Sequence, residues 1–238
     1  GIPLVVETET MKRFPASHRA RDVRDGLLAC ARSVGVAIRF DTVVTDFAPV
    51  GSRWRVGHEQ SEPLDCDAVI VATGGLSVPT TGSDGLGLRV LERLGHAMHP
   101  TYPALTPVTS TSPHFAALSG VSLTVTLTAR DAHRSATATG GFLFTHRGYS
   151  GPAVLDVSHV VARSSAKADE RAQVRVQWTS LGESEWDRAL RGERTRTGVG
   201  ALRVELPDRL AGVLASLAGV DTSRSLAELR REERLRLI

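Results

Sequence analysis

Apolar residues near the start of the chain recur first at strand spacing, then at helix spacing, then as a short continuous run. Residues 4–10 alternate between apolar and polar positions, as a strand does. Residues 19–35 place apolar side chains three or four positions apart, as on one face of a helix. Residues 36–40 are a short apolar run and predict a buried strand. Together these lengths predict a βαβ unit with a right-handed parallel crossover.

The next segment predicts an antiparallel ribbon inserted into a parallel sheet. Residues 42–60 contain two alternating runs around a Gly-Ser turn, which indicates two antiparallel strands. The run "DAVIVATGG" at 67–75 begins with continuous apolar residues, typical of a strand buried on both faces. A short helix with a glycine stop is predicted over 87–96. Residues 1–100 are therefore expected to form a mostly parallel α/β domain.

The pattern changes near residue 100, where closely spaced prolines interrupt both helix and central strand. Alternating strands and then amphipathic helices follow. The predicted elements are strands over 121–131 and 172–178, a strand, turn and helix over 140–163, and helices over 184–192, 206–219 and 225–238. We therefore predict a first domain over 1–100 and a second, mixed domain over 101–238.

Composition supports a packed globular protein and disfavours several other classes. Hydrophobic residues make up 41% of the 238 residues and charged residues 23%. The apolar runs are too short to span a bilayer, and the first residues lack the pattern of a secretion signal. Two separated cysteines provide neither a disulfide framework nor a tetrahedral metal site. We expect a cytoplasmic protein with no metal ion and no membrane partner.

Charge patterning argues against a dedicated nucleic-acid-binding surface. The formal net charge is +3, and the basic residues, nearly all arginine, are scattered along the chain. Aromatic residues make up 5% of the chain, which disfavours a base-stacking platform. A nucleic-acid partner is therefore not expected from composition.

The glycine-rich stretch "ATGGLSVPTTGSDGLG" at 72–87 is the first candidate site. In α/β folds, ligands bind at the carboxyl ends of parallel strands, and glycines let backbone approach a ligand closely. The amides of Thr73, Gly74 and Gly75 could line a nucleotide. A Gly-Gly pair after a strand is equally typical of an ordinary turn. Likewise, Ser83 or Asp84 could cap the following helix rather than leave its N-terminus free for an anion.

Four ordered motifs give the chain a definite resemblance. The segments "FPASHRARDVRDGLL", "AVIVATGGLSVPTTGSDGLG", "LGHAMHPTYPALTPV" and "LFTHRGYSGPAVLDVS" resemble the BaiN-type family of NAD(P)/FAD-dependent oxidoreductases. The resemblance implies a fold class of α/β plus α+β. A partial Rossmann-like FAD-binding domain would be followed by an inserted domain of antiparallel β-strands and helices, beginning near "PALTPV".

The resemblance also implies cofactor-binding residues in both domains. Ala72 to Gly75 would lie along FAD, the backbone of Val44 would meet the adenine, and Ser150 with Gly151 would bring a helix N-terminus toward the isoalloxazine. The candidate cofactor-binding residues are Val44, Ala72, Thr73, Gly74, Gly75, Ser150 and Gly151. Catalytic residues are not identified. His146 is a weak candidate for proton transfer, and its alternative role is to hold the "GYSGP" turn.

The expected function is FAD-dependent reduction of an unsaturated or carbonyl small molecule, with NAD(P)H as a possible electron donor. The family's G-x-G-x-x-G loop and closing glycine-rich segment are not in this sequence. We therefore expect an internal fragment whose partners include the remaining parts of its own polypeptide. Two alternatives stay open: a non-enzymatic folded binding module, and a flavoprotein that acts on RNA.

Overall fold

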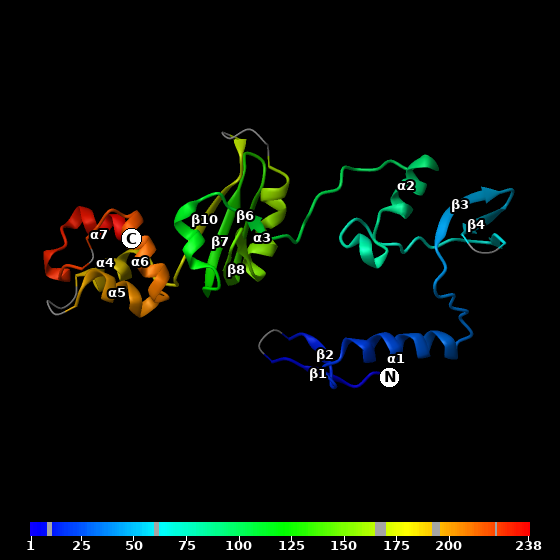
Figure 1. Ribbon diagram of the computed structural model, residues 1–238, viewed down its shortest axis with the longest axis horizontal. Helices are drawn as coiled ribbons and strands as arrows, with labels where there is room; N and C mark the ends of the chain where they lie inside the picture. The colour runs from blue at the N-terminus through cyan, green and yellow to red at the C-terminus, as the bar shows by residue number, and fades with distance from the viewer. Residues whose placement is uncertain (9–10, 60–61, 165–169, 192–195, 222) are drawn as a thin grey trace. The chain divides into compact units, whose positions relative to one another are not determined.

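The computed structural model divides into two compact units, Gly1–Met98 and His99–Ile238, and each unit is described by itself (Figure 1). The described residues are all of 1–238 except 9–10, 60–61, 165–169, 192–195 and 222. The assignment of these units to a flavin domain and an inserted domain stays a prediction.

The first unit opens with a short antiparallel pair and a helix. Strand β1 (Leu4–Val6) pairs with β2 (Arg13–Pro15), and helix α1 (Ala20–Ser33) follows. The helix confirms the periodicity of residues 19–35, although none of its side chains is buried. The strand expected over 4–10 is shorter, and its last two positions lie outside the described residues.

The predicted βαβ unit is wrong for this structure. Residues 36–40 form no strand, and the side chains of Val36 and Phe40 are about half exposed. Strand β1 pairs antiparallel with β2 instead. A short apolar run becomes a buried strand only where a neighbouring strand can pair with its amides and carbonyls, and periodicity alone does not identify that neighbour.

The predicted antiparallel ribbon is confirmed. Strand β3 (Val44–Val50) pairs with β4 (Arg53–His58), and β4 pairs with β5 (Leu64–Cys66). The turn between β3 and β4 contains Gly51 at a φ of +64°, a backbone conformation that favours glycine. The ribbon is therefore set by local sequence: two alternating runs and a glycine turn.

The segment 67–75 does not form the predicted buried strand. Its residues have no regular secondary structure, and the side chain of Ile70 is 93% exposed. A strand buried on both faces needs paired neighbours and covering helices, and in the described part of the first unit every strand pair is antiparallel and lies elsewhere. Helix α2 (Leu86–Arg93) follows as predicted, and Gly95 ends it at a φ of +91°.

The second unit contains a five-stranded antiparallel sheet in the order β10-β7-β8-β9-β6. Its strands are β6 (Val108–Thr109), β7 (Ser122–Arg130), β8 (Ser135–Thr145), β9 (Gly148–Ser150) and β10 (Gln173–Gln177). Helix α3 (Pro152–Ala162) packs on β7 and β8, with Pro152 in its first turn. This arrangement confirms the predicted strands and the predicted strand, turn and helix.

Short helices complete the second unit. They are η2 (Pro113–Leu118), α4 (Glu183–Leu190), α5 (Gly198–Glu205), α6 (Asp208–Leu217), η4 (Leu226–Glu228) and α7 (Arg231–Leu237). Helix α5 was not predicted, because its two glycines lower helix propensity. An ion pair from Arg234 to Asp187 connects α7 to α4, and the neighbouring guanidinium groups of Arg191 and Arg234 lower the pKa of Asp187.

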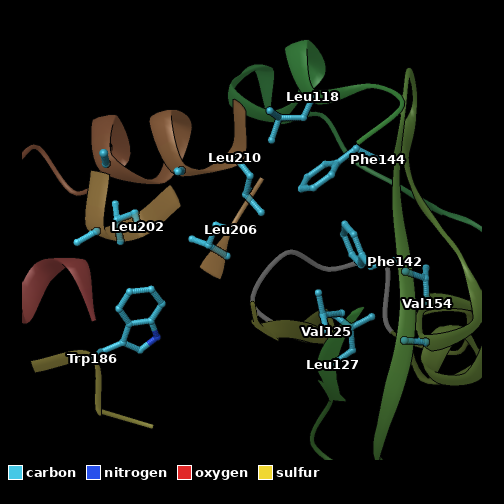
Figure 2. Close-up of a cluster of buried hydrophobic side chains, with 14 of the residues drawn as sticks. Leu118, Val125, Leu127, Phe142, Phe144, Val154, Trp186, Leu202, Leu206 and Leu210 are labelled. Carbon is cyan, nitrogen blue, oxygen red and sulfur yellow. The ribbon is translucent and has the colours of Figure 1, made fainter. Parts of the chain in front are cut away.

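One hydrophobic core joins the sheet to these helices. Alternate residues of β7 and β8 face inward and are buried, whereas the threonines between them hydrogen-bond across the strands on the outer face. Figure 2 shows the rings of Phe142 and Phe144 on the sheet and the side chains of Leu206 and Leu210 in the same cluster. The core therefore holds the strand, turn and helix segment against the C-terminal helices.

Leu210→Ala should lower the free energy of unfolding of the second unit by about 2–5 kcal/mol, because Leu210 is fully buried and its removal leaves a cavity. Leu217→Ala on the same helix is the matched control, since Leu217 is 45% exposed and should cost less than about 1 kcal/mol. Urea unfolding followed by circular dichroism measures both. Equal effects would contradict the assigned core.

Candidate functional site

The glycine-rich segment forms a turn that a serine side chain holds closed. Ala72 to Gly75 are exposed, and Gly74 has a φ of +72°. A Cβ on Gly74 would lie 3.2 Å from the Cβ of Ser83. The hydroxyl of Ser83 accepts a hydrogen bond from the Val78 amide at 2.9 Å and donates one to the Val78 carbonyl at 2.8 Å. The left-handed backbone of Gly74 thus fits the ordinary turn, one of the two interpretations given for this segment, the other being a lining for a nucleotide.

Helix α2 begins against this turn. A Cβ on Gly87 would lie 2.2 Å from Oγ1 of Thr73, so glycine is needed for the helix to approach Thr73. At the helix start, the amide of Leu86 donates to a carboxylate oxygen of Asp84 at 2.9 Å. Asp84 therefore occupies one of the N-terminal amides, which favours its capping role over an anion site at this helix.

Gly75 differs from its neighbours because its backbone faces open space. A Cβ built on Gly75 meets no atom within 4 Å, and its φ is not in the left-handed region. Neither a turn nor close packing requires glycine here. The exposed backbone offers a surface that a ligand could approach closely, which is the role predicted for this position.

The ribbon contributes a second feature of the first unit. Val44 opens β3, and its register partner on β4 is His58. Both ring nitrogens of His58 are shielded from solvent and have no hydrogen-bond partner among the described residues. Shielded polar atoms are ordinarily paired, so the site has unused hydrogen-bonding capacity beside Val44. A lone histidine in an alternating strand carries no distinguishing sequence signal, and His58 was not predicted.

Two observations in the first unit bear on the predicted cofactor-binding residues. Gly75 leaves its backbone face open, and His58 has unpaired nitrogens next to the strand position expected to meet the adenine. Binding of FAD by Val44 and by Ala72 to Gly75 stays a prediction. The structure places Ala72 to Gly75 in one loop and Val44 on the ribbon.

The remaining predicted residues lie in the second unit, at the turn from β8 to β9 and the start of α3. The ring of His146 is exposed in this turn. Its neighbours anchor the turn: the Arg147 amide donates to the Thr145 hydroxyl at 3.4 Å, and the Ser110 amide donates to the Arg147 carbonyl at 3.0 Å. The turn is thus held by the residues on either side of His146, and proton transfer by His146 stays a prediction.

Gly151 has a structural requirement of its own. Its φ is +102°, and a Cβ would lie 2.5 Å from the carbonyl oxygen of Gly141 on β8. Ser150 pairs with Leu143 in the last step of the β8–β9 ladder. Glycine at 151 therefore lets the chain leave β9 and enter α3 directly against β8, whether or not a cofactor lies nearby.

Gly151→Ala should destabilise the second unit by about 2 kcal/mol or more, because alanine is strained at this φ and its methyl group collides with β8. Gly212→Ala is the control: it lies inside α6 with no atom within 4 Å of a new Cβ, and should stabilise by about 0.5–1 kcal/mol. Thermal unfolding by circular dichroism compares them. A Gly151→Ala protein as stable as the parent would contradict the close approach.

The described residues contain neither a metal-binding cluster nor a membrane-spanning helix. In the part of the chain that the structure describes, no three histidine, cysteine, aspartate or glutamate side chains gather as a metal site. Among the same residues, no helix is both long and apolar enough to cross a bilayer. Cys30 is exposed, because α1 buries no side chain.

Comparison with known proteins places the chain in a family. The model of the HI0933-like protein Rossmann domain matches residues 1–226. The ribosomal RNA dihydrouridine synthase of Haemophilus influenzae is 44% identical over 101 residues, which are 42% of this chain and 24% of that protein. The corresponding Escherichia coli synthase is 38% identical over 98 residues, 40% of this chain and 24% of that protein.

A third relative has a different name. The 3-dehydro-bile acid delta(4,6)-reductase of Clostridium scindens is 28% identical over 164 residues, 68% of this chain and 40% of that protein. The matched segments thus span between 24% and 40% of the length of these relatives. The family match confirms the predicted fold class, a Rossmann-type domain combined with antiparallel sheets and helices. The chain belongs to the HI0933-like family of Rossmann-type flavoproteins, the BaiN-type family that its four motifs resemble.

Proposed function

We propose that this chain is part of an FAD-dependent enzyme that reduces a ring carbon–carbon double bond conjugated to a carbonyl group. The observation that supports the proposal is the chemistry shared by its differently named relatives. A dihydrouridine synthase adds two hydrogens to the uracil double bond, which is conjugated to a ring carbonyl. A delta(4,6)-reductase of a 3-dehydro steroid acts on double bonds conjugated to the 3-carbonyl. One reaction class covers both.

In the proposed reaction the cofactor would carry the electrons, and the protein would bind the cofactor and donate a proton. Bound FAD, reduced by NAD(P)H, would supply the hydride for one carbon of the double bond, and a proton donor of the protein would protonate the neighbouring carbon. The open backbone at Gly75 would let the dinucleotide approach without a side chain between them. The backbone of Val44, the register partner of His58 on the ribbon, stays a proposed contact to the adenine. Ser150 and Gly151 stay proposed contacts to the flavin ring, and His146 a proposed proton donor.

The first substrate class we propose is a small cyclic enone. We propose that its reduction takes place in the cytoplasm. A second candidate is a uridine in ribosomal RNA, which the 44% and 38% identities to two ribosomal RNA dihydrouridine synthases favour. The two candidates share the reacting group and differ in the size of what carries it. Substrate class does not follow from fold, so the choice requires a direct assay.

Gly75→Val should weaken FAD binding by at least about tenfold while the fold is retained, because valine would fill the open face and its Cβ would have no protein atom within 4 Å. Gly212→Val, at an exposed position of α6 with equally open surroundings, is the control and should bind FAD as the parent does. Quenching of FAD fluorescence measures binding, and circular dichroism measures the fold. Unchanged affinity in Gly75→Val would remove this loop from the cofactor site.

Anaerobic reoxidation of the reduced flavin tests the reaction and its substrate. We expect cyclohex-2-enone to restore oxidised flavin absorbance, with cyclohexanone, which lacks the double bond, as the inactive control. Faster reoxidation with an unmodified ribosomal RNA transcript, and dihydrouridine in that RNA by mass spectrometry, would favour the second candidate. Failure of both, with FAD bound, would reject the reaction class. Failure to bind FAD by a polypeptide that also contains the expected G-x-G-x-x-G loop would favour a non-enzymatic module.

A further inference from the structure

The second unit contains a cavity that none of the predicted cofactor residues lines. It has a volume of about 480 Å³ and lies between the inner face of β10, helix α3 and β6. Buried side chains form its inner wall, among them Phe142 at 2% exposure and Val157 at 1% exposure. Val174, 41% exposed, marks its mouth. Helix α3 covers β7 and β8, which leaves the inner face of β10 incompletely covered.

Aromatic rings concentrate around this cavity in a chain that has few of them. Aromatic residues make up 5% of the sequence. Four of them line the cavity from different segments: Phe115, Phe142, Tyr149 and Trp178. The Phe142 centroid lies 5.3 Å from that of Tyr149 and 5.5 Å from that of Trp178, and the Phe115 centroid lies 6.4 Å from both. The four rings thus pack against one another and give the cavity a largely aromatic lining, a surface on which a further ring can stack face-on or edge-on.

Polar groups in the lining are few, and two of them form a pair. The hydroxyl of Tyr149 donates to the hydroxyl oxygen of Ser110 at 3.2 Å. Both residues line the cavity. The oxygen of Tyr149 keeps lone pairs that can accept a hydrogen bond from a ligand hydroxyl. An apolar cavity of roughly 300–1,000 Å³ with a few convergent polar groups is the usual form of a small-molecule site.

We propose that this cavity binds a small, planar, mainly apolar ring compound that carries one hydroxyl group. The buried inner wall and the limited volume suit a small molecule rather than a protein segment. The aromatic side chains would contact its ring faces and edges, and the Tyr149–Ser110 pair would orient its oxygen. The site lies wholly within the second unit and requires no flavin, so it is independent of the proposed reaction.

Isothermal titration of the protein with 2-naphthol tests the proposal. We expect one saturable site per chain. Val174→Trp places an indole at the mouth and should weaken binding at least about tenfold. Val204→Trp is the matched control, because Val204 is also an exposed valine, 60% exposed on α5 and outside the cavity, and should stay within about twofold of the parent. Circular dichroism verifies that both variants fold.

Tyr149→Phe separates the hydroxyl pair from ring packing. Removing the hydroxyl should weaken 2-naphthol by about threefold to tenfold and leave naphthalene binding unchanged. The proposal is overturned if the folded parent shows no saturable binding, or if Val174→Trp binds as the parent does. Equal weakening in Val204→Trp also overturns it. One further result overturns the proposal: the parent does not bind 2-naphthol, and sedimentation shows that it is a dimer which Val174→Trp converts to a monomer. The cavity face around Val174 would then contact a second copy of the chain.

Discussion

Burial of one face of the β7–β8 pair is the constraint on which the second unit depends. Alternate positions of the two strands supply Val125, Leu127, Phe142 and Phe144 to one side, and the hydrophobic effect requires a cover for them. Helix α3 supplies that cover on β7 and β8, and the C-terminal helices extend the same core. The chain must therefore turn from β9 into α3 while its backbone lies directly against β8. Position 151 requires glycine because a Cβ there would collide with the carbonyl group of Gly141.

The same constraint explains the cavity. A helix of eleven residues, lying over β7 and β8, leaves the inner face of β10 partly uncovered. Residues of the "HRGYSGP" motif thus serve two purposes: Gly151 permits the turn, and Tyr149 lines the cavity and hydrogen-bonds to Ser110. The motif was expected to contact a cofactor, but Gly151 and Tyr149 also have roles in the fold of the second unit that involve no ligand.

The first unit contrasts with the second in how it is stabilised. Among its described residues, the buried apolar side chains are Phe47 on the ribbon and Val90 on α2. Its loops are ordered instead by specific local contacts, such as Ser83 with Val78 and Asp84 with Leu86. In the same unit, a Cβ at Gly75 would face open space, and the shielded nitrogens of His58 have no hydrogen-bond partner among the described residues.

Local pattern in the amino-acid sequence determined the ribbon, helices α1 to α3, the alternating strands β7, β8 and β10, and the family motifs that the comparison confirmed. These features depend on neighbours in the chain: alternation, helical spacing, turn glycines and caps. Tertiary structure alone decided that 36–40 and 67–75 are not strands here, because a strand requires a partner that periodicity does not name. It also decided which aromatic residues meet, and that His58 lies opposite Val44 with its nitrogens unpaired, because such contacts join residues distant in the sequence.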